Sequence, residues 1–154
     1  MSTVVELQSL RRDIVKKIEN ERRLLTNYER SYESLRMFKE SVVTSQSDFH
    51  SVSKQKENLL KQVEAISANC RMAGKYASGM GTTLSGVGVK MVGKTYDELL
   101  FSIGKKLSYY LGKIDRCDDK ITNWNQQVVC LDDEIEAAKQ AEQLALLQQE
   151  EETV

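Results

Sequence analysis

Apolar residues recur every three or four positions along two long segments of this chain, which is the spacing of a heptad repeat. With Leu7 assigned to position a, the first repeat covers residues 7–73, and 15 of its 20 a and d residues are apolar. A period of 3.5 residues keeps one narrow stripe of a helix facing a partner helix over many turns. The a residues are Leu7, Ile14, Glu21, Tyr28, Leu35, Val42, Phe49, Lys56, Val63 and Cys70, and the d residues are Leu10, Lys17, Leu24, Ser31, Phe38, Ser45, Val52, Leu59, Ile66 and Ala73.

The second repeat covers residues 96–145, and 13 of its 14 a and d residues are apolar. Two such stripes predict an all-α fold, a long antiparallel helical hairpin built from coiled-coil heptads, in a single domain of residues 1–154. The a residues are Leu100, Leu107, Ile114, Ile121, Val128, Ile135 and Glu142, and the d residues are Ile103, Tyr110, Cys117, Trp124, Leu131, Ala138 and Ala145.

The ends of the two helices carry recognisable signals. Thr3 followed by Glu6 is a capping-box pattern, so the first helix is predicted over about residues 3–73. Six of the eight glycines lie between residues 74 and 93, which predicts a glycine-rich connection over residues 74–94. The second helix is predicted over about residues 95–148, followed by an acidic, frayed tail at residues 149–154.

A turn centred near residue 84 would place residue 73 opposite residue 96, and residue 145 opposite residue 24. The first helix would then overhang the second by about 20 residues. This overhang keeps Leu7, Leu10, Ile14 and Ile18 on one side, so these four residues are predicted to bind another chain. The core of the hairpin is predicted to include Leu35, Phe38, Phe49, Leu59, Ile66, Leu107, Tyr110, Ile114, Ile121, Trp124 and Val128.

Composition narrows the class of protein. The chain has no proline, 29% charged residues and a formal net charge of −1, with both signs interspersed. These features favour long solvated helices and argue against nucleic acid as a partner, which would need a clustered basic face. There is no secretory signal-peptide pattern and no apolar segment of membrane-spanning length. Three cysteines are read as reduced thiols, so a cytoplasmic protein is expected.

One sequence motif associated with nucleotide binding is present. Residues 88–95, Gly-Val-Lys-Met-Val-Gly-Lys-Thr, match the phosphate-binding pattern G-x-x-x-x-G-K-[ST]. That loop normally follows a buried strand of a parallel sheet, and no sheet is predicted here, so the segment is interpreted as a flexible turn and a helix start. With one histidine and no nucleophile motif, the sequence predicts a protein that is not an enzyme and uses no cofactor or metal.

The layout resembles a known group of bacterial proteins. A long helix, a glycine-rich turn and a second helix that opens Tyr-Asp-Glu-Leu-Leu at residues 96–100 resemble the small helical-hairpin proteins of the WxG superfamily from Firmicutes type VII secretion loci. The subgroup most similar is the YwqH-like partners of LXG-domain toxins. The resemblance implies a protein that binds the helical N-terminal domain of such a toxin, with a second small helical protein as a further partner, and acts as a targeting factor or chaperone for its export.

Two signatures of that group are absent from the sequence. No W-x-G turn is present, since the one tryptophan is Trp124, and no Y-x-x-x-[DE] export signal is found. We therefore expect an export signal shared with the partner or supplied by it, with this chain cytoplasmic or co-secreted. The alternative is a coiled-coil scaffold protein that self-associates as a homo-oligomer through the same stripes.

Overall fold

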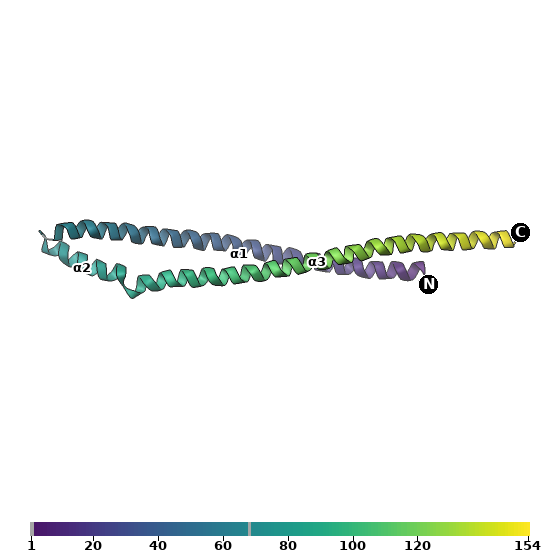
Figure 1. Ribbon diagram of the computed structural model, residues 1–154, viewed down its shortest axis with the longest axis horizontal. Helices are drawn as coiled ribbons and strands as arrows, with labels where there is room; N and C mark the ends of the chain where they lie inside the picture. Colours follow the sequence, from purple (N-terminus) through teal and green to yellow (C-terminus); the bar gives the residue numbers. More distant parts are fainter. Residues whose placement is uncertain (1, 68) are drawn as a thin grey trace. The chain divides into compact units, whose positions relative to one another are not determined.

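The structure, a computed structural model, describes residues 2–67 and 69–154, and these residues form three α-helices and no strand. Helix α1 spans Val4–Ser67, α2 spans Arg71–Ser85 and α3 spans Val87–Glu152 (Figure 1). The predicted all-α helical hairpin is confirmed. The chain divides into two compact units: unit 1 combines Met1–Ser31 with Tyr110–Val154, and unit 2 is Tyr32–Tyr109.

The capping box predicted at the start of α1 is confirmed. The backbone N–H of Thr3 donates to Glu6 Oε2 at 3.0 Å, and the backbone N–H of Glu6 donates to Thr3 Oγ1 at 3.2 Å. Two N–H groups that the first helical turn leaves without partners are thereby satisfied.

The position of the turn differs from the prediction. The first helix ends at Ser67 rather than near residue 73, and the next begins at Arg71 after the extended residue Cys70. Ala68, which falls inside the predicted first helix, lies outside the described residues. The predicted glycine-rich loop at residues 74–94 is also wrong, because this segment is helical except around Gly86.

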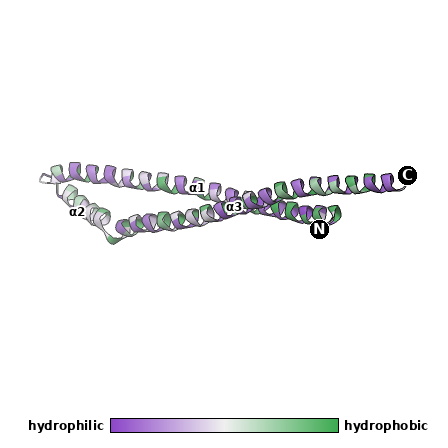
Figure 2. Cartoon of the chain, turned by 45° about the vertical axis from the view of Figure 1, so that its right-hand side comes forward, coloured by the Kyte–Doolittle hydropathy of each residue, from purple (hydrophilic) through white to green (hydrophobic). Residues whose placement is uncertain are grey.

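Two of the three glycines of α2, Gly74 and Gly81, face α1, whereas a Cβ on Gly79 would meet nothing within 4 Å. A Cβ on Gly81 would lie 3.7 Å from Leu60 Cδ2, and one on Gly74 would lie 3.8 Å from Ser67 Cβ. Between them, Ala77 is buried. Each glycine in a helix costs about 1 kcal/mol relative to alanine, and packing against α1 offsets that cost. In Figure 2, α2 has mostly pale colours of intermediate hydropathy, whereas polar and apolar residues alternate along α1 and α3.

The second heptad repeat is present in α3 as predicted. Its a and d residues are buried or half-buried from Leu100 to Ala138, whereas Glu142 and Ala145 are exposed. α3 continues as a helix to Glu152, so four residues of the predicted frayed tail, residues 149–152, are helical.

On α1 the covered edge differs from the predicted one. The a residues of α1 are buried or half-buried except Lys56, but the second row of covered residues is position e, four residues after each a, and not position d. The covered e residues of α1 are Arg11, Ile18, Leu25, Tyr32, Lys39, Gln46, Ser53, Leu60 and Ser67.

In unit 1, α1 and α3 run antiparallel in a register defined by three pairs. Arg11 Nε donates to Asp132 Oδ1, Lys120 Nζ lies 3.7 Å from Glu21 Oε1, and the rings of Tyr28 and Tyr110 have centroids 6.4 Å apart. The predicted register, with residue 24 opposite residue 145, is therefore wrong by about four heptads. A shift by whole heptads leaves each apolar stripe in phase, which is why periodicity did not exclude the predicted register.

In unit 2, the two long helices are also antiparallel. Gln46 Nε2 donates to Asp97 Oδ1 at 3.1 Å, and the ring centroids of Phe49 and Tyr96 are 6.0 Å apart. Val42 and Ile103 are buried in this unit. Position e of α1 thus contributes a polar partner for an acidic residue near the start of the second predicted helix.

Gly86, which separates α2 from α3, provides a test of the fold. A Cβ at Gly86 would lie 2.7 Å from the backbone oxygen of Thr82, so Gly86→Ala requires the backbone to move. We expect this variant to lose about 1–3 kcal/mol of stability in thermal unfolding followed by circular dichroism.

The matched control is Gly104→Ala, because a Cβ there would meet nothing within 4 Å. That change should raise stability by up to about 1 kcal/mol through helix propensity. Equal effects of the two substitutions would contradict the close approach at Gly86.

Candidate interaction surface

The N-terminal stripe predicted to bind another chain is covered by α3. Leu7, Ile14 and Ile18 are 7%, 6% and 5% exposed and form one buried cluster with Leu131 and Ile135. The expectation that these residues lack an intramolecular partner is therefore wrong. Of the four predicted residues, only Leu10 is exposed, at 50%. The cause is the shifted register, which places the last turns of the heptad seam of α3 against the start of α1.

A polar interruption lies next to this cluster in unit 1. Glu21 is 9% exposed at position a of α1, beside the buried thiol of Cys117 on α3. Burial raises the pKa of Cys117, and a side-chain hydrogen bond with Glu21 raises the pKa further. Both effects favour the protonated thiol of Cys117 over the thiolate, which is the nucleophilic form of cysteine.

The second apolar edge of α1 in unit 2 is left uncovered by the hairpin. Four d residues spaced at multiples of seven lie on this edge and are about half exposed; we call them the outer stripe. They are Phe38 at 50%, Val52 at 49%, Leu59 at 50% and Ile66 at 55%. From the first to the last of them, the stripe is about 42 Å long at 1.5 Å per residue.

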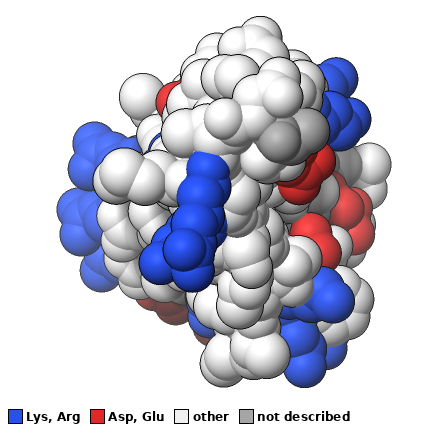
Figure 3. All heavy atoms as spheres, turned by 90° about the vertical axis from the view of Figure 1, so that its left-hand side faces the viewer, with Lys and Arg blue, Asp and Glu red and all other residues white. Residues whose placement is uncertain are grey.

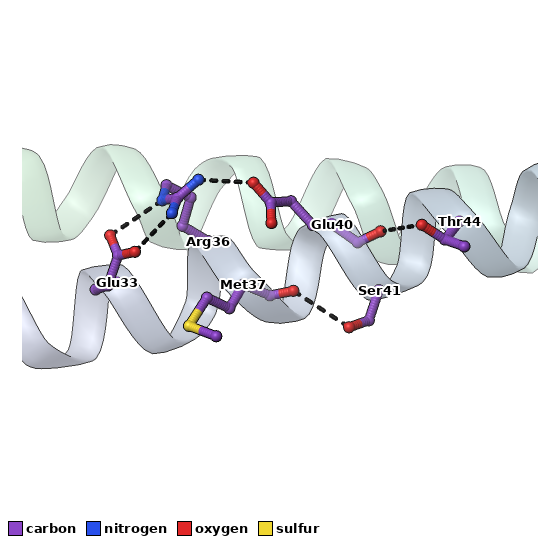
Figure 4. A network of polar contacts seen from close by, with 6 residues as sticks. All are labelled: Glu33, Arg36, Met37, Glu40, Ser41 and Thr44. Atoms are coloured by element: carbon purple, nitrogen blue, oxygen red, sulfur yellow. Dashed lines mark hydrogen bonds and ion pairs between the residues drawn. The ribbon is translucent and has the colours of Figure 1, made fainter.

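The opposite side of α1 in unit 2 is polar. Arg36 lies 2.6 Å from Glu33 and 2.7 Å from Glu40, and its hydrogen bond to Glu33 lowers the pKa of that carboxyl group. Figure 4 shows this network on α1, with the Met37 side chain pointing away from Arg36. At about 100° per residue, the Glu33–Arg36–Glu40 network lies roughly opposite position d around the helix. α1 therefore has a solvated face and a separate apolar edge.

The end of unit 2 near the α1–α2 connection adds to the uncovered apolar surface. Met72 and Tyr76 of α2 are 80% and 47% exposed, near the C-terminal end of the outer stripe at Ile66. Figure 3 looks onto this end, where uncharged atoms fill most of the view and basic side chains lie across its middle and at its edges.

The predicted core residues fall into two groups. Eight of them lie half-buried on the seam between α1 and α3: Leu35, Phe49, Leu107, Tyr110, Ile114, Ile121, Trp124 and Val128. Phe38, Leu59 and Ile66 are half exposed and lie outside the seam, contrary to the prediction. The signal that could have separated the groups is position e, where Arg11 and Gln46 match the acidic residues Asp132 and Asp97.

The segment that matches the phosphate-binding pattern lies inside α3. Lys94 is placed 3.8 Å from Glu98, and Thr95 Oγ1 donates to the backbone oxygen of Met91 at 2.8 Å. The expected flexible turn at residues 88–95 is therefore wrong. From Lys90 onward, where the backbone N–H donates to the oxygen of Gly86, the N–H groups of this segment point along the helix and do not form a loop that surrounds a phosphate.

Among the described residues, no group of three or more His, Cys, Asp or Glu side chains is placed to hold a metal ion. None of the described helices contains a stretch that is long and apolar enough to cross a membrane. Comparison with known protein families, curated proteins and solved structures finds no match to this chain.

The burial of the N-terminal stripe predicts that alanine substitutions of Ile14 and Leu10 have different effects on the free energy of unfolding. Ile14→Ala should cost about 2–4 kcal/mol in denaturant unfolding, because it removes a side chain from the cluster with Leu131. Leu10→Ala should change stability by about 0.5 kcal/mol or less, since Leu10 is half exposed. Equal costs would mean that α3 does not cover this stripe.

The three thiols should react differently with an alkylating reagent. Cys70 and Cys130 are exposed and Cys117 is buried, with its pKa raised. Mass spectrometry should find two labels on the folded chain at about pH 8 and three after denaturation. Replacing Glu21 by Gln should lower the pKa of Cys117, because the carboxylate then no longer opposes the thiolate. Rapid labelling of Cys117 in the folded wild-type chain would contradict its burial.

Proposed function

We propose that this chain is a non-enzymatic binding partner for a helical domain of another protein, which docks along the outer stripe of α1 in unit 2. One observation carries the proposal: the hairpin covers the more polar edge of α1, position e, and leaves apolar residues of position d exposed. If the helices packed only to give the isolated chain its greatest stability, α3 would cover position d, the more apolar edge of α1.

The energetics of the exposed edge support docking by a helix. Fully burying a large aliphatic or aromatic side chain contributes about 1.5–3 kcal/mol, so four half-exposed side chains represent a substantial unused contribution. The heptad spacing of Phe38, Val52, Leu59 and Ile66 matches the knobs that a third helix would pack between. A partner helix of about 28 residues would cover the whole outer stripe.

The kind of partner follows from the resemblance of the sequence to type VII secretion hairpin proteins. We propose the helical N-terminal domain of an LXG toxin, with this chain as its targeting factor or chaperone. Covering the apolar surface of the toxin domain before export would be the chaperone action. Since this chain has no Y-x-x-x-[DE] signal of its own, the complex would use a signal from the partner.

The outer stripe is tested by the double substitution of Phe38 and Leu59 by Gln. Both side chains are half exposed, so the hairpin should keep its unfolding free energy within about 0.5 kcal/mol. Binding to the co-expressed N-terminal domain of an LXG toxin should weaken at least about tenfold, because two apolar anchors are lost. Titration calorimetry measures the affinity and circular dichroism the stability.

A matched control replaces Phe101 and Val129 by Gln. These residues are 66% and 59% exposed on α3 and lie outside the outer stripe. The control should bind normally. Normal binding by the Phe38 and Leu59 variant would show that the stripe is not the docking surface. Absence of any toxin domain in material co-purified from the native host would contradict the proposed partner.

A further inference from the structure

The last part of α3 has no cover from the rest of the chain. Residues 139–152, which we call the C-terminal segment, are exposed on every side, and Ala138 is the last residue of α3 packed against the cluster at the start of α1. Leu144, Leu146 and Leu147 in this segment are 61%, 61% and 57% exposed. The segment is a helix of 14 residues that extends beyond its intramolecular partner.

The charge of this segment is unfavourable for an isolated helix end. Glu150, Glu151 and Glu152 occupy the last turn of α3, which contains no basic residue. A helix C-terminus carries partial negative charge, so three carboxylates there repel both it and one another. A bare helix of this length is only marginally stable in water. A basic, partly apolar surface beside this end would neutralise the repulsion between the carboxylates and would stabilise the helix by packing.

Unit 1 itself presents such a surface. On one flank, α1 and α3 form a groove of about 480 Å³ lined by Gln8, Arg11, Arg12, Asp132, Ile135 and Lys139. The groove contains three basic side chains against one carboxylate, that of Asp132, which is already paired with Arg11. Ile135 supplies a buried apolar residue. Beyond Lys139, which itself lines the groove, the C-terminal segment continues α3 as a helix and so cannot fold back into the groove of its own chain.

We propose that two copies of this chain form an antiparallel dimer in which the C-terminal segment of each copy lies in this groove of the other. Residue 141 is midway between Asp132 and Glu150, so a two-fold axis at Ala141 would bring Glu150–Glu152 of one copy beside Arg11 and Arg12 of the other. The same axis brings Leu147 of one copy opposite Ile135 of the other, with Leu146 next to it.

The contact uses only residues of unit 1. It does not depend on the proposed binding of a toxin domain, and a dimer would carry two copies of the outer stripe.

The test measures the mass of the purified full-length chain by light scattering and sedimentation equilibrium. At about 100 μM protein and about 0.05 M salt, we expect twice the mass of one chain. At about 1 M salt, where the Debye length falls to about 3 Å, the dimer dissociation constant should rise at least about tenfold. A monomer under the first condition would overturn the proposal.

Charge reversal identifies the surfaces. Replacing Glu150, Glu151 and Glu152 by Lys should produce a monomer, and so should the separate double variant Arg12→Glu with Lys139→Glu. Combining all five substitutions restores opposite charges across the contact, so the combined variant should form dimers again. Dimers in all three variants, or a monomer in the combined variant, would overturn the proposed contact.

Two controls separate this contact from other effects. Replacing Asp115, Asp118 and Asp119 by Lys makes the same change in net charge elsewhere on α3, and this variant should remain dimeric. A chain truncated after Gln140 removes most of the exposed segment and should stay folded by circular dichroism, yet be monomeric. A dimer of the truncated chain would show that the C-terminal segment is not the occupant of the groove.

Discussion

The structure depends on one constraint: α3 presents a single narrow apolar stripe, so it can cover only one edge of α1. The a and d residues of α3 from Leu100 to Ala138 form this stripe. α1 offers three rows of residues around the same side, at positions d, a and e. Two of these rows can pack against α3, and the third must remain exposed to solvent. Which row stays outside decides the surface that the protein offers to other molecules.

Polar pairs across the seam select the edge and the register. Position e of α1 places Arg11 against Asp132 in unit 1 and Gln46 against Asp97 in unit 2. Individual exposed pairs contribute at most about 1 kcal/mol, so they do not outweigh apolar burial by themselves. They distinguish between registers that differ by whole heptads, in which the apolar contacts are nearly equivalent. The buried Glu21, close to Lys120, acts in the same direction.

The uncovered surfaces follow from this choice of edge and register. In unit 2, the row left outside contains Phe38, Val52, Leu59 and Ile66, which form the outer stripe. In unit 1, the register leaves α3 longer than the start of α1, so the overhang consists of the C-terminal segment and not of the N-terminus. The first surface suits a heterologous helix, while the acidic end of the second suits a basic groove. The two proposed contacts therefore require partners of different chemistry.

The sequence by itself determined the all-α hairpin, the capping box at Thr3 and Glu6, and the seam of α3, because each depends on spacing within one helix. It did not determine the turn, because the glycine-rich segment forms the helix α2, where a Cβ on Gly81 would lie in contact with Leu60 of α1. Nor did it determine whether Leu7, Ile14 and Ile18 are buried within the chain, since a heptad repeat keeps the same pattern after a shift of whole heptads. Only the tertiary structure decided which edge of α1 is covered, because that choice depends on side chains from both helices at once.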